Sequence, residues 1–387
     1  MSNTRQITVA RRALRLAHFC TDIYNSFIPT IMPVLIRQFG LSLSQAGFYS
    51  SFLPLVSAFF QPIFGLIADR MRTRTFIILG PIIAGIFVCL CAYVKEIWQL
   101  LPLLFIAALG IGAFHPPAVA MAGELAKRDT DHSPSVAKFI VAGTLGASVS
   151  SYLVYLLLGP ENNIHNLIYA VPIGLIGGLA VAFTVPKMEI QVRKPFSPEV
   201  WKEKAKSLLL LVLIVISRSM VVISLMIFIP ELLYLEASQS LKIGAIGILV
   251  FHTANALGSV VGSYTEKRFG PANIMIFSFI AGIPFIWFFL ETKSLVLLFI
   301  GGFIVNMTQA INVSLAQKLI PENAATVSSL TMGFGWGIAT LGMPLIGYFA
   351  DIWGLASALK YNALIFLLIS AVMVLILKSD RQYQKII

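Results

Sequence analysis

Ionisable side chains inside apolar stretches are the residues of this 387-residue chain whose types could do chemistry. The first long apolar run holds His18, Asp22 and Asn25 at spacings of i, i+4 and i+7, which predicts one shared helix face. His115 stands in the fourth such run and Arg218 in the seventh. Histidine changes charge near neutral pH, a carboxyl binds a proton, and arginine holds anions. These residue types therefore indicate binding of protons and of a small anion.

Amide and imidazole groups recur in two later apolar runs. Asn306, Gln309 and Asn312 follow one another at i, i+3 and i+6, and His252 and Asn255 share an earlier run. We interpret these five as candidate contacts to a bound solute. Because amides also form hydrogen bonds between helices in membranes, a structural role for them stays open.

Each ionisable candidate has a structural alternative. Asp22 could be held as a pair by His18 or Arg218 instead of coupling proton or substrate movement. Arg218 could serve as a counter-ion instead of an anion anchor, and His115 could satisfy carbonyls freed by a proline kink. If Asp22 does bind a proton, movement of Arg218 or of an anionic solute would load and unload it, because a nearby cation favours the ionised carboxyl.

The elements that must position these residues are membrane helices. The chain is 58% hydrophobic and only 12% charged, which is typical of a polytopic membrane protein. A helix needs about 20 apolar residues to cross the bilayer core. Twelve segments meet this length, so the predicted fold class is all-α: 13–37, 44–68, 74–94, 99–123, 135–158, 165–185, 207–235, 243–264, 272–291, 295–319, 325–349 and 357–377.

The distribution of the basic residues predicts how the chain is oriented in the membrane. The net charge is +11, but the basic residues fall in short turns instead of one patch, so nucleic-acid binding is not expected. With both termini and the even-numbered loops on one side, that side holds 22 of the 28 Lys and Arg and the other side five. Both termini are therefore predicted to be cytoplasmic.

A polar interval divides the chain into two similar parts. We expect a six-helix bundle over 1–185, a cytoplasmic linker over 186–206 with a short amphipathic helix around Trp201, and a second bundle over 207–387. A shift of 197 residues superimposes Pro33 on Pro230 and Gly47 on Gly244. Such a repeat predicts two halves related by an axis along the membrane normal.

A charged turn after the second apolar run repeats in the same way. It contains Gly65, Asp69, Arg70, Arg72 and Arg74, and the shift of 197 places Gly262, Glu266 and Lys267 opposite its first three members. Twelve segments in two halves with this turn resemble the major facilitator superfamily. By that resemblance the turn closes an inner gate, and helices 1, 4, 7 and 10 line a central cavity.

Three further places resemble the fosmidomycin-resistance branch of that superfamily. They are His18-x-x-x-Asp22, Gln61-Pro62-x-x-Gly65 and Phe114-His115-Pro116. The branch implies proton-driven export of small, often anionic compounds. Relatives often carry an acid directly after His-Pro, and this chain has Pro117 there, so a role tied to that acid does not transfer.

The predicted function is therefore proton-coupled secondary transport, with export of a small organic anion or drug-like compound preferred on family grounds. Uptake of such an anion, and lipid flipping or scrambling on similar helices, are the alternatives. No nucleophile with a base and no metal cluster stands out, so we expect no enzyme, cofactor or metal. The expected partners are a small anion, protons and lipids, for a monomer in a bacterial inner membrane.

Two glycine patterns receive structural interpretations. Gly143 and Gly146 are expected to allow close helix packing, as is the glycine-rich stretch from Gly333. Gly347 and Asp351 copy part of the charged turn but fall on the predicted external side, so we interpret them as a helix end.

Overall fold

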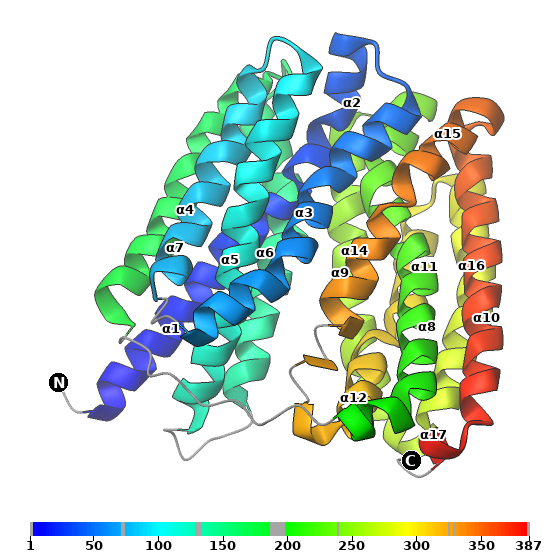
Figure 1. Ribbon diagram of the computed structural model, residues 1–387. Helices are drawn as coiled ribbons and strands as arrows, with labels where there is room; N and C mark the ends of the chain where they lie inside the picture. Colours follow the sequence, from blue (N-terminus) through cyan, green and yellow to red (C-terminus); the bar gives the residue numbers. More distant parts are fainter. Residues whose placement is uncertain are drawn as a thin grey trace. The chain divides into compact units, whose positions relative to one another are not determined.

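The computed structural model is helical, and it has no strand in the residues that it describes, which are 3–70, 74–127, 134–185, 198–237, 240–323, 326–327 and 330–384 (Figure 1). The predicted all-α fold class is confirmed.

The helices of the first half of the chain are α1 (Asn3–Asp22), η1 (Ile23–Ser26), α2 (Phe27–Phe39), α3 (Leu43–Arg70), α4 (Arg74–Leu90), η2 (Cys91–Tyr93), η3 (Ile97–Gln99), α5 (Leu100–Lys127), α6 (Pro134–Leu158), η4 (Ile164–Ala170) and α7 (Val171–Thr184). Those of the second half are α8 (Pro198–Glu231), η5 (Leu232–Glu236), α9 (Leu241–Phe269), α10 (Pro271–Thr292), α11 (Leu295–Asn306), α12 (Gln309–Leu319), η6 (Pro321–Asn323), η7 (Leu330–Phe334), α14 (Gly335–Thr340), α15 (Met343–Trp353), α16 (Leu355–Lys378) and α17 (Arg381–Gln384).

Ten helical stretches in the described part of the chain are long and apolar enough to cross a membrane. The two remaining predicted segments correspond to α3 and to the sequence of η7, α14 and α15. Each of the twelve predicted segments therefore has a helical counterpart.

Several of these helices are interrupted where the prediction had them continuous. The first has a 3-10 turn, η1, directly after Asp22, and the tenth breaks between Asn306 and Gln309. The seventh and eleventh contain the π-helical segments η5 and η7. Interruptions of this kind change which way the neighbouring side chains point and often mark functional positions.

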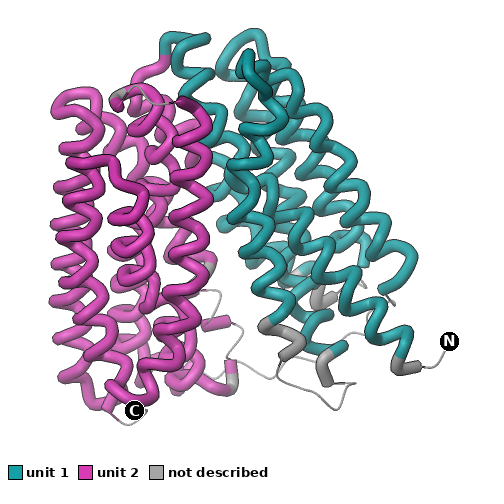
Figure 2. The backbone as a smooth tube through the Cα atoms, turned by 180° about the vertical axis from the view of Figure 1, so that it is seen from behind, with its two compact units in different colours: residues 1–40, 52–192 teal, residues 41–51, 193–387 magenta. Residues whose placement is uncertain are grey.

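Two compact units divide the chain, and Figure 2 colours them separately. The first comprises Met1–Gly40 and Phe52–Val192, with α1 packed on α6 and α7 and with α4 packed on α5. The second comprises Leu41–Ser51 and Arg193–Ile387, with α16 packed on α8 and α10, and α9 on α11. The assignment of 1–185 and 207–387 as domains joined by a 186–206 linker stays a prediction.

The amphipathic helix expected around Trp201 is part of a longer element. Residues 198–206 form the first turns of α8, which continues without interruption to Glu231. No glycine or proline lies between Glu199 and Ile229 to end the helix. The Trp201 Nε1 donates to Asn323 Oδ1 at 3.0 Å, so this end of α8 packs on η6.

The start of α3 is bound to α15 within the second unit. The Asp351 carboxylate accepts the backbone N–H groups of Leu43 at 2.7 Å and Ser44 at 3.0 Å. A Cβ on Gly347 would lie 2.3 Å from the Leu43 carbonyl oxygen. Since α15 ends at Trp353, Asp351 lies at a helix end, as predicted, whereas Gly347 lies in the middle of this helix. The carboxylate there also caps the free N–H groups of another helix.

Candidate functional site

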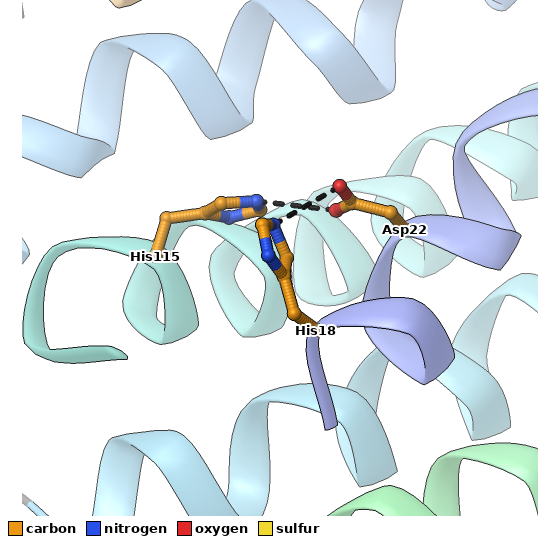
Figure 3. A group of neighbouring side chains, drawn as sticks. All are labelled: His18, Asp22 and His115. Carbon is orange, nitrogen blue, oxygen red and sulfur yellow. Dashed lines mark hydrogen bonds and ion pairs between the residues drawn. The ribbon is translucent and has the colours of Figure 1, made fainter. Parts of the chain in front are cut away.

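Three of the predicted residues form a cluster in the first unit (Figure 3). His18 and Asp22 project from α1 and His115 from α5. His18 Nε2 lies 3.2 Å from Asp22 Oδ2, and His115 Nε2 lies 3.1 Å from Asp22 Oδ1. The side chains of His18 and Asp22 are only 8% and 14% exposed. One carboxylate thus meets two imidazoles in a largely buried place.

The partners of the two Nδ1 atoms determine which nitrogen of each imidazole carries a hydrogen. His18 Nδ1 lies 2.8 Å from the Phe139 carbonyl oxygen, and His115 Nδ1 lies 2.8 Å from that of Ile111. A carbonyl only accepts, so the hydrogen-bond network assigns a hydrogen to each Nδ1. In a neutral imidazole Nε2 would then be an acceptor facing an acceptor carboxylate. Both contacts to Asp22 become hydrogen bonds only when the cluster binds two further protons.

Packing from α6 holds the cluster in shape. The Phe139 ring stacks on His18 with 4.1 Å between ring centroids. A Cβ on Gly143 would lie 2.4 Å from His18 Nε2 and 2.5 Å from Asp22 Oδ2. Gly143 was predicted only as a helix-packing residue, but it also makes room for the His18–Asp22 pair. Nothing in the sequence distinguishes it from other packing glycines.

The turn that follows Asp22 is anchored on both sides. The Tyr24 hydroxyl donates to the Ala170 carbonyl oxygen at 2.9 Å and accepts the Gly174 N–H at 2.8 Å. Ser150 on α6 donates to the Ile23 carbonyl oxygen. Carbonyl and N–H groups that a regular α-helix would pair internally are therefore satisfied by neighbouring helices.

Asn25 does not join the cluster. It lies on η1, and the structure records no hydrogen bond for its side chain among the described residues. The expected face with His18 and Asp22 assumed 3.6 residues per turn, whereas a 3-10 turn has 3.0. The interruption accounts for its separation.

A second candidate site surrounds Arg218 in the second unit. Arg218 is 1% exposed, and one of its terminal nitrogens donates to Asn306 Oδ1 at 2.8 Å. Asn306 itself is held by a 2.8 Å bond from its Nδ2 to the Gly302 carbonyl oxygen. Arg218 Nε has no hydrogen-bond partner, and no acid of the described residues forms an ion pair with this guanidinium. A buried cation without a counter-ion is costly, so the site favours an anion.

A pocket of about 140 Å³ opens beside that guanidinium. Its polar and aromatic lining is Arg218, Gln309, Asn312, Thr331 and Trp336, and two valines complete it. Both side-chain amide atoms of Asn312 are buried without a partner among the described residues. The break between α11 and α12 thus brings two predicted residues, Gln309 and Asn312, to the same pocket as Arg218.

Two pocket residues were not among the sequence candidates. Thr331 and Trp336 belong to η7 and α14, where the glycine-rich stretch was interpreted as helix packing. A tryptophan between Gly335 and Gly337 was the available signal, because small neighbours leave room for a solute against its ring. His252 and Asn255 are buried on α9 and do not line this pocket.

The structure describes only some residues of the charged turn from Gly65 to Arg74, which was predicted to close the inner gate. Arg72 lies outside the described residues, as do the side chains of Asp69 and Arg70. Arg74 donates to the Ala182 carbonyl oxygen. A Cβ on Gly65 would contact Pro116 of α5 at 3.7 Å.

Its repeat lies on α9, with Glu266 and Lys267 in the last turns. A Cβ on Gly262 would lie 1.8 Å from the carbonyl oxygen of Met307, in the break of the tenth helix. The two repeat-related glycines therefore face the fourth helix in one unit and the tenth in the other.

The sequence profile of the Major Facilitator Superfamily matches residues 14–341. The chain belongs to this superfamily. It is therefore a multi-pass membrane transporter and not an enzyme. The fold agrees: a bacterial homologue of the human lysosomal transporter Spinster, in an inward-facing and occupied conformation, superimposes with a TM-score of 0.81 at 16% identity, covering 95% of this chain and 96% of that one.

Two named relatives align with most of this chain. This major facilitator is 24% identical to the fosmidomycin resistance protein of Escherichia coli (strain K12), covering 88% of this chain and 86% of that protein. It is 23% identical to the gentisate transporter of Corynebacterium glutamicum, covering 81% and 73%. The predicted resemblance to the fosmidomycin-resistance branch is confirmed by the first of these.

The ligand atoms of His18, Asp22 and His115 all lie within 4.8 Å of one another. These three residues could therefore also coordinate a small metal cation. The chemistry available in the two units is therefore binding of protons, or of a cation in their place, and binding of an anion.

Proposed function

We propose that this major facilitator exports a small organic anion in exchange for protons. The observation that carries the proposal is the His18–Asp22–His115 cluster, whose two Nε2–carboxylate contacts require added protons to become hydrogen bonds. Such a cluster has a protonated form that is hydrogen-bonded throughout and a deprotonated form that is not. A proton gradient can therefore shift the balance between these two forms of the cluster.

The uncompensated charge of Arg218 supports an anion as cargo. A carboxylate would pair with the guanidinium in a planar, two-bond arrangement, and Trp336 would cover an attached ring. Gentisate, which names one relative, is an aromatic carboxylate. We therefore propose Arg218, Gln309 and Asn312 as anion contacts, with Asn306 positioning Arg218. Asn25, His252 and Asn255 stay candidates without a shared pocket.

Coupling needs the two sites to favour different transport states. In alternating access, the two halves expose a central site to one side of the membrane at a time. We propose that bound anion and bound protons select opposite directions of that change, with the charged turn from Gly65 to Arg74 and its repeat at Gly262, Glu266 and Lys267 closing the inner side. Cytoplasmic termini in a bacterial inner membrane complete the proposal.

Reconstitution tests this function. Purified protein in liposomes loaded with gentisate should release it when the outside is made acidic, and a chelator should leave the rate unchanged. Acidification that drives gentisate inward would reverse the proposed direction and support uptake. Exchange of labelled lipid that ignores the pH gradient, with no anion movement, would support a flippase and contradict the proposal.

A further inference from the structure

Glu231 is a buried acid that neither candidate site uses. It is the last residue of α8, directly after Pro230, and its side chain has no solvent exposure within the protein itself. The π-helical segment η5 follows it. Neither Pro230 nor a π-helical turn continues the regular hydrogen-bond ladder of α8, so the backbone beside this acid is able to change its geometry.

No side chain among the described residues offers the carboxyl group a hydrogen bond. Both of its oxygens are buried and lack a hydrogen bond among the described residues. Its neighbours along the chain, Phe228, Ile229, Leu232 and Leu233, are fully buried apolar residues. An ionised carboxylate here would lose its hydration and gain in return only an interaction with its own backbone N–H, which leaves a cost of several kcal/mol. The protonated form avoids most of that cost.

Charged groups on the elements packed against this end of α8 are engaged elsewhere. Asp351 on α15 accepts the N–H groups of α3, and Lys360 on α16 pairs with Glu291 of α10. Lys242 at the start of α9 is exposed. No charged side chain of the described residues acts on the Glu231 carboxyl. The uncharged titratable groups near this end are Tyr49, Tyr234, Tyr348 and Tyr361.

Other charged groups on α8 and its neighbours are too far away to compensate it. Arg218 lies 13 residues back along α8, which is about 20 Å at a rise of 1.5 Å per residue. On α9, Pro230 packs against Gly244, and His252 lies about 12 Å further along that helix. The remaining groups lie toward the opposite end of α8, at Glu266, Lys267, Arg268, Lys318, Lys378 and Arg381.

We infer that Glu231 is a proton-binding site, protonated in this state and able to release its proton when the Pro230–Glu236 segment rearranges. The ligand is H⁺, and the site lies in the second unit, separate from the His18–Asp22–His115 cluster in the first. Its role in transport rests on the proposed proton coupling, whereas its protonation does not. The transporter would then bind protons in both units.

Infrared spectroscopy of the purified protein in detergent tests directly whether the Glu231 carboxyl is protonated. At about pH 6 the wild type should show the carbonyl stretch of a protonated carboxyl that is lost in Glu231→Gln and retained in Glu161→Gln, an exposed acid used as the control. Raising the pH should convert the band to that of a carboxylate. Glutamine matches the shape of the neutral acid, so the variant should fold.

A second measurement needs no variant. Incorporating ¹³C-labelled glutamate into the wild type should shift the band, because the acid responsible is a glutamate. A band that persists in Glu231→Gln, that does not shift on labelling, or that never titrates would overturn the inference. Gradient-independent gentisate transport by the wild type would overturn the proposed function and leave these spectra as the test of Glu231.

Discussion

The carbonyl groups of Phe139 and Ile111 accept hydrogen bonds from the Nδ1 atoms of His18 and His115, and so they determine what Asp22 can do. With both Nδ1 positions occupied, protons enter only at Nε2 or at the carboxylate. The sequence predicted the three residues, and the i, i+4 spacing explains His18 with Asp22. It contained no signal for the Phe139 carbonyl, which comes from α6 by tertiary packing, whereas the Ile111 carbonyl lies one turn before His115 on α5 itself.

Gly143 offers a test of the cluster's geometry. Gly143→Ala places a methyl group 2.4 Å from His18 Nε2, so His18 or Asp22 must move. We expect a loss of about 1 to 3 kcal/mol in the free energy of unfolding and a larger loss of gradient-driven transport. The control is Gly123→Ala on α5, where a Cβ has nothing within 4 Å. Equal transport by both variants, measured in liposomes, would contradict the geometry.

Arg218 offers a test of the anion site. Arg218→Ala should weaken binding of gentisate by about ten- to a hundredfold, because charge-assisted hydrogen bonds contribute about 1.5 to 3 kcal/mol. Binding of its uncharged amide should change much less, and Arg218→Lys should keep part of the difference. Calorimetric titration measures all of these. If acid and amide lose affinity equally, the role of Arg218 is structural.

At the scale of the elements, the Asp351 carboxylate and the Ser44 hydroxyl, which donates to the Pro344 carbonyl oxygen at 3.0 Å, bind the start of α3 to α15. Asp351→Ala removes the acceptor for two backbone N–H groups of α3. We expect a cost of about 1 kcal/mol, seen as a fall of about 1 °C in the midpoint of thermal unfolding of a chain of this length. Glu161→Ala is the control, because this exposed acid has no recorded hydrogen bond or ion pair among the residues that the structure describes. Indistinguishable midpoints for the two variants would mean that the cap contributes nothing.

The junction of α8 with α17 should respond to pH. The Ser207 hydroxyl, with the Gln382 N–H and the Lys206 ammonium, lowers the pKa of Asp380, which lies outside the membrane-spanning segments. A lowered pKa stabilises the fold above the unfolded value of about 3.9, and that stability is lost as pH falls through the folded value.

The stability advantage of the wild type over Asp380→Asn should therefore be constant above about pH 5 and shrink toward about pH 3. Thermal unfolding in detergent across this range measures it. Ser207→Ala should reproduce part of the difference. An advantage that grows as the pH falls would have the wrong sign for this account.

The helices themselves could be predicted, but their interruptions could not. Apolar length alone located all twelve segments, because crossing a bilayer requires it. The breaks at η1 and between Asn306 and Gln309 have no proline or glycine within them. At η1 a neighbouring helix satisfies a freed carbonyl, as Ser150 does for Ile23, and at the second break the Thr308 hydroxyl donates to the Val305 carbonyl oxygen. The pairing at η1 is not local, and for that reason the sequence pattern gave Asn25 a regular helical position that the 3-10 turn does not provide.

At the scale of the molecule, the superfamily could be recognised from a repeat and a charged turn. The repeat-related residues His115 and Asn312 both lie at a candidate site, one in each unit. The first unit carries the titratable cluster and the second carries the uncompensated cation. The duplication has thus kept the positions and changed the chemistry. In the proposed function the cluster in the first unit couples protons and the second unit binds the anion, with Glu231 as a further proton site there.

The measurement that tests this account most directly compares two kinds of gentisate movement in liposomes for the wild type and Asp22→Asn. Asparagine keeps the size of the side chain but holds no exchangeable charge. We predict that the variant still exchanges internal for external gentisate, while export driven by a pH gradient falls at least tenfold. Full gradient-driven export by Asp22→Asn would contradict the central claim that this cluster couples protons to transport.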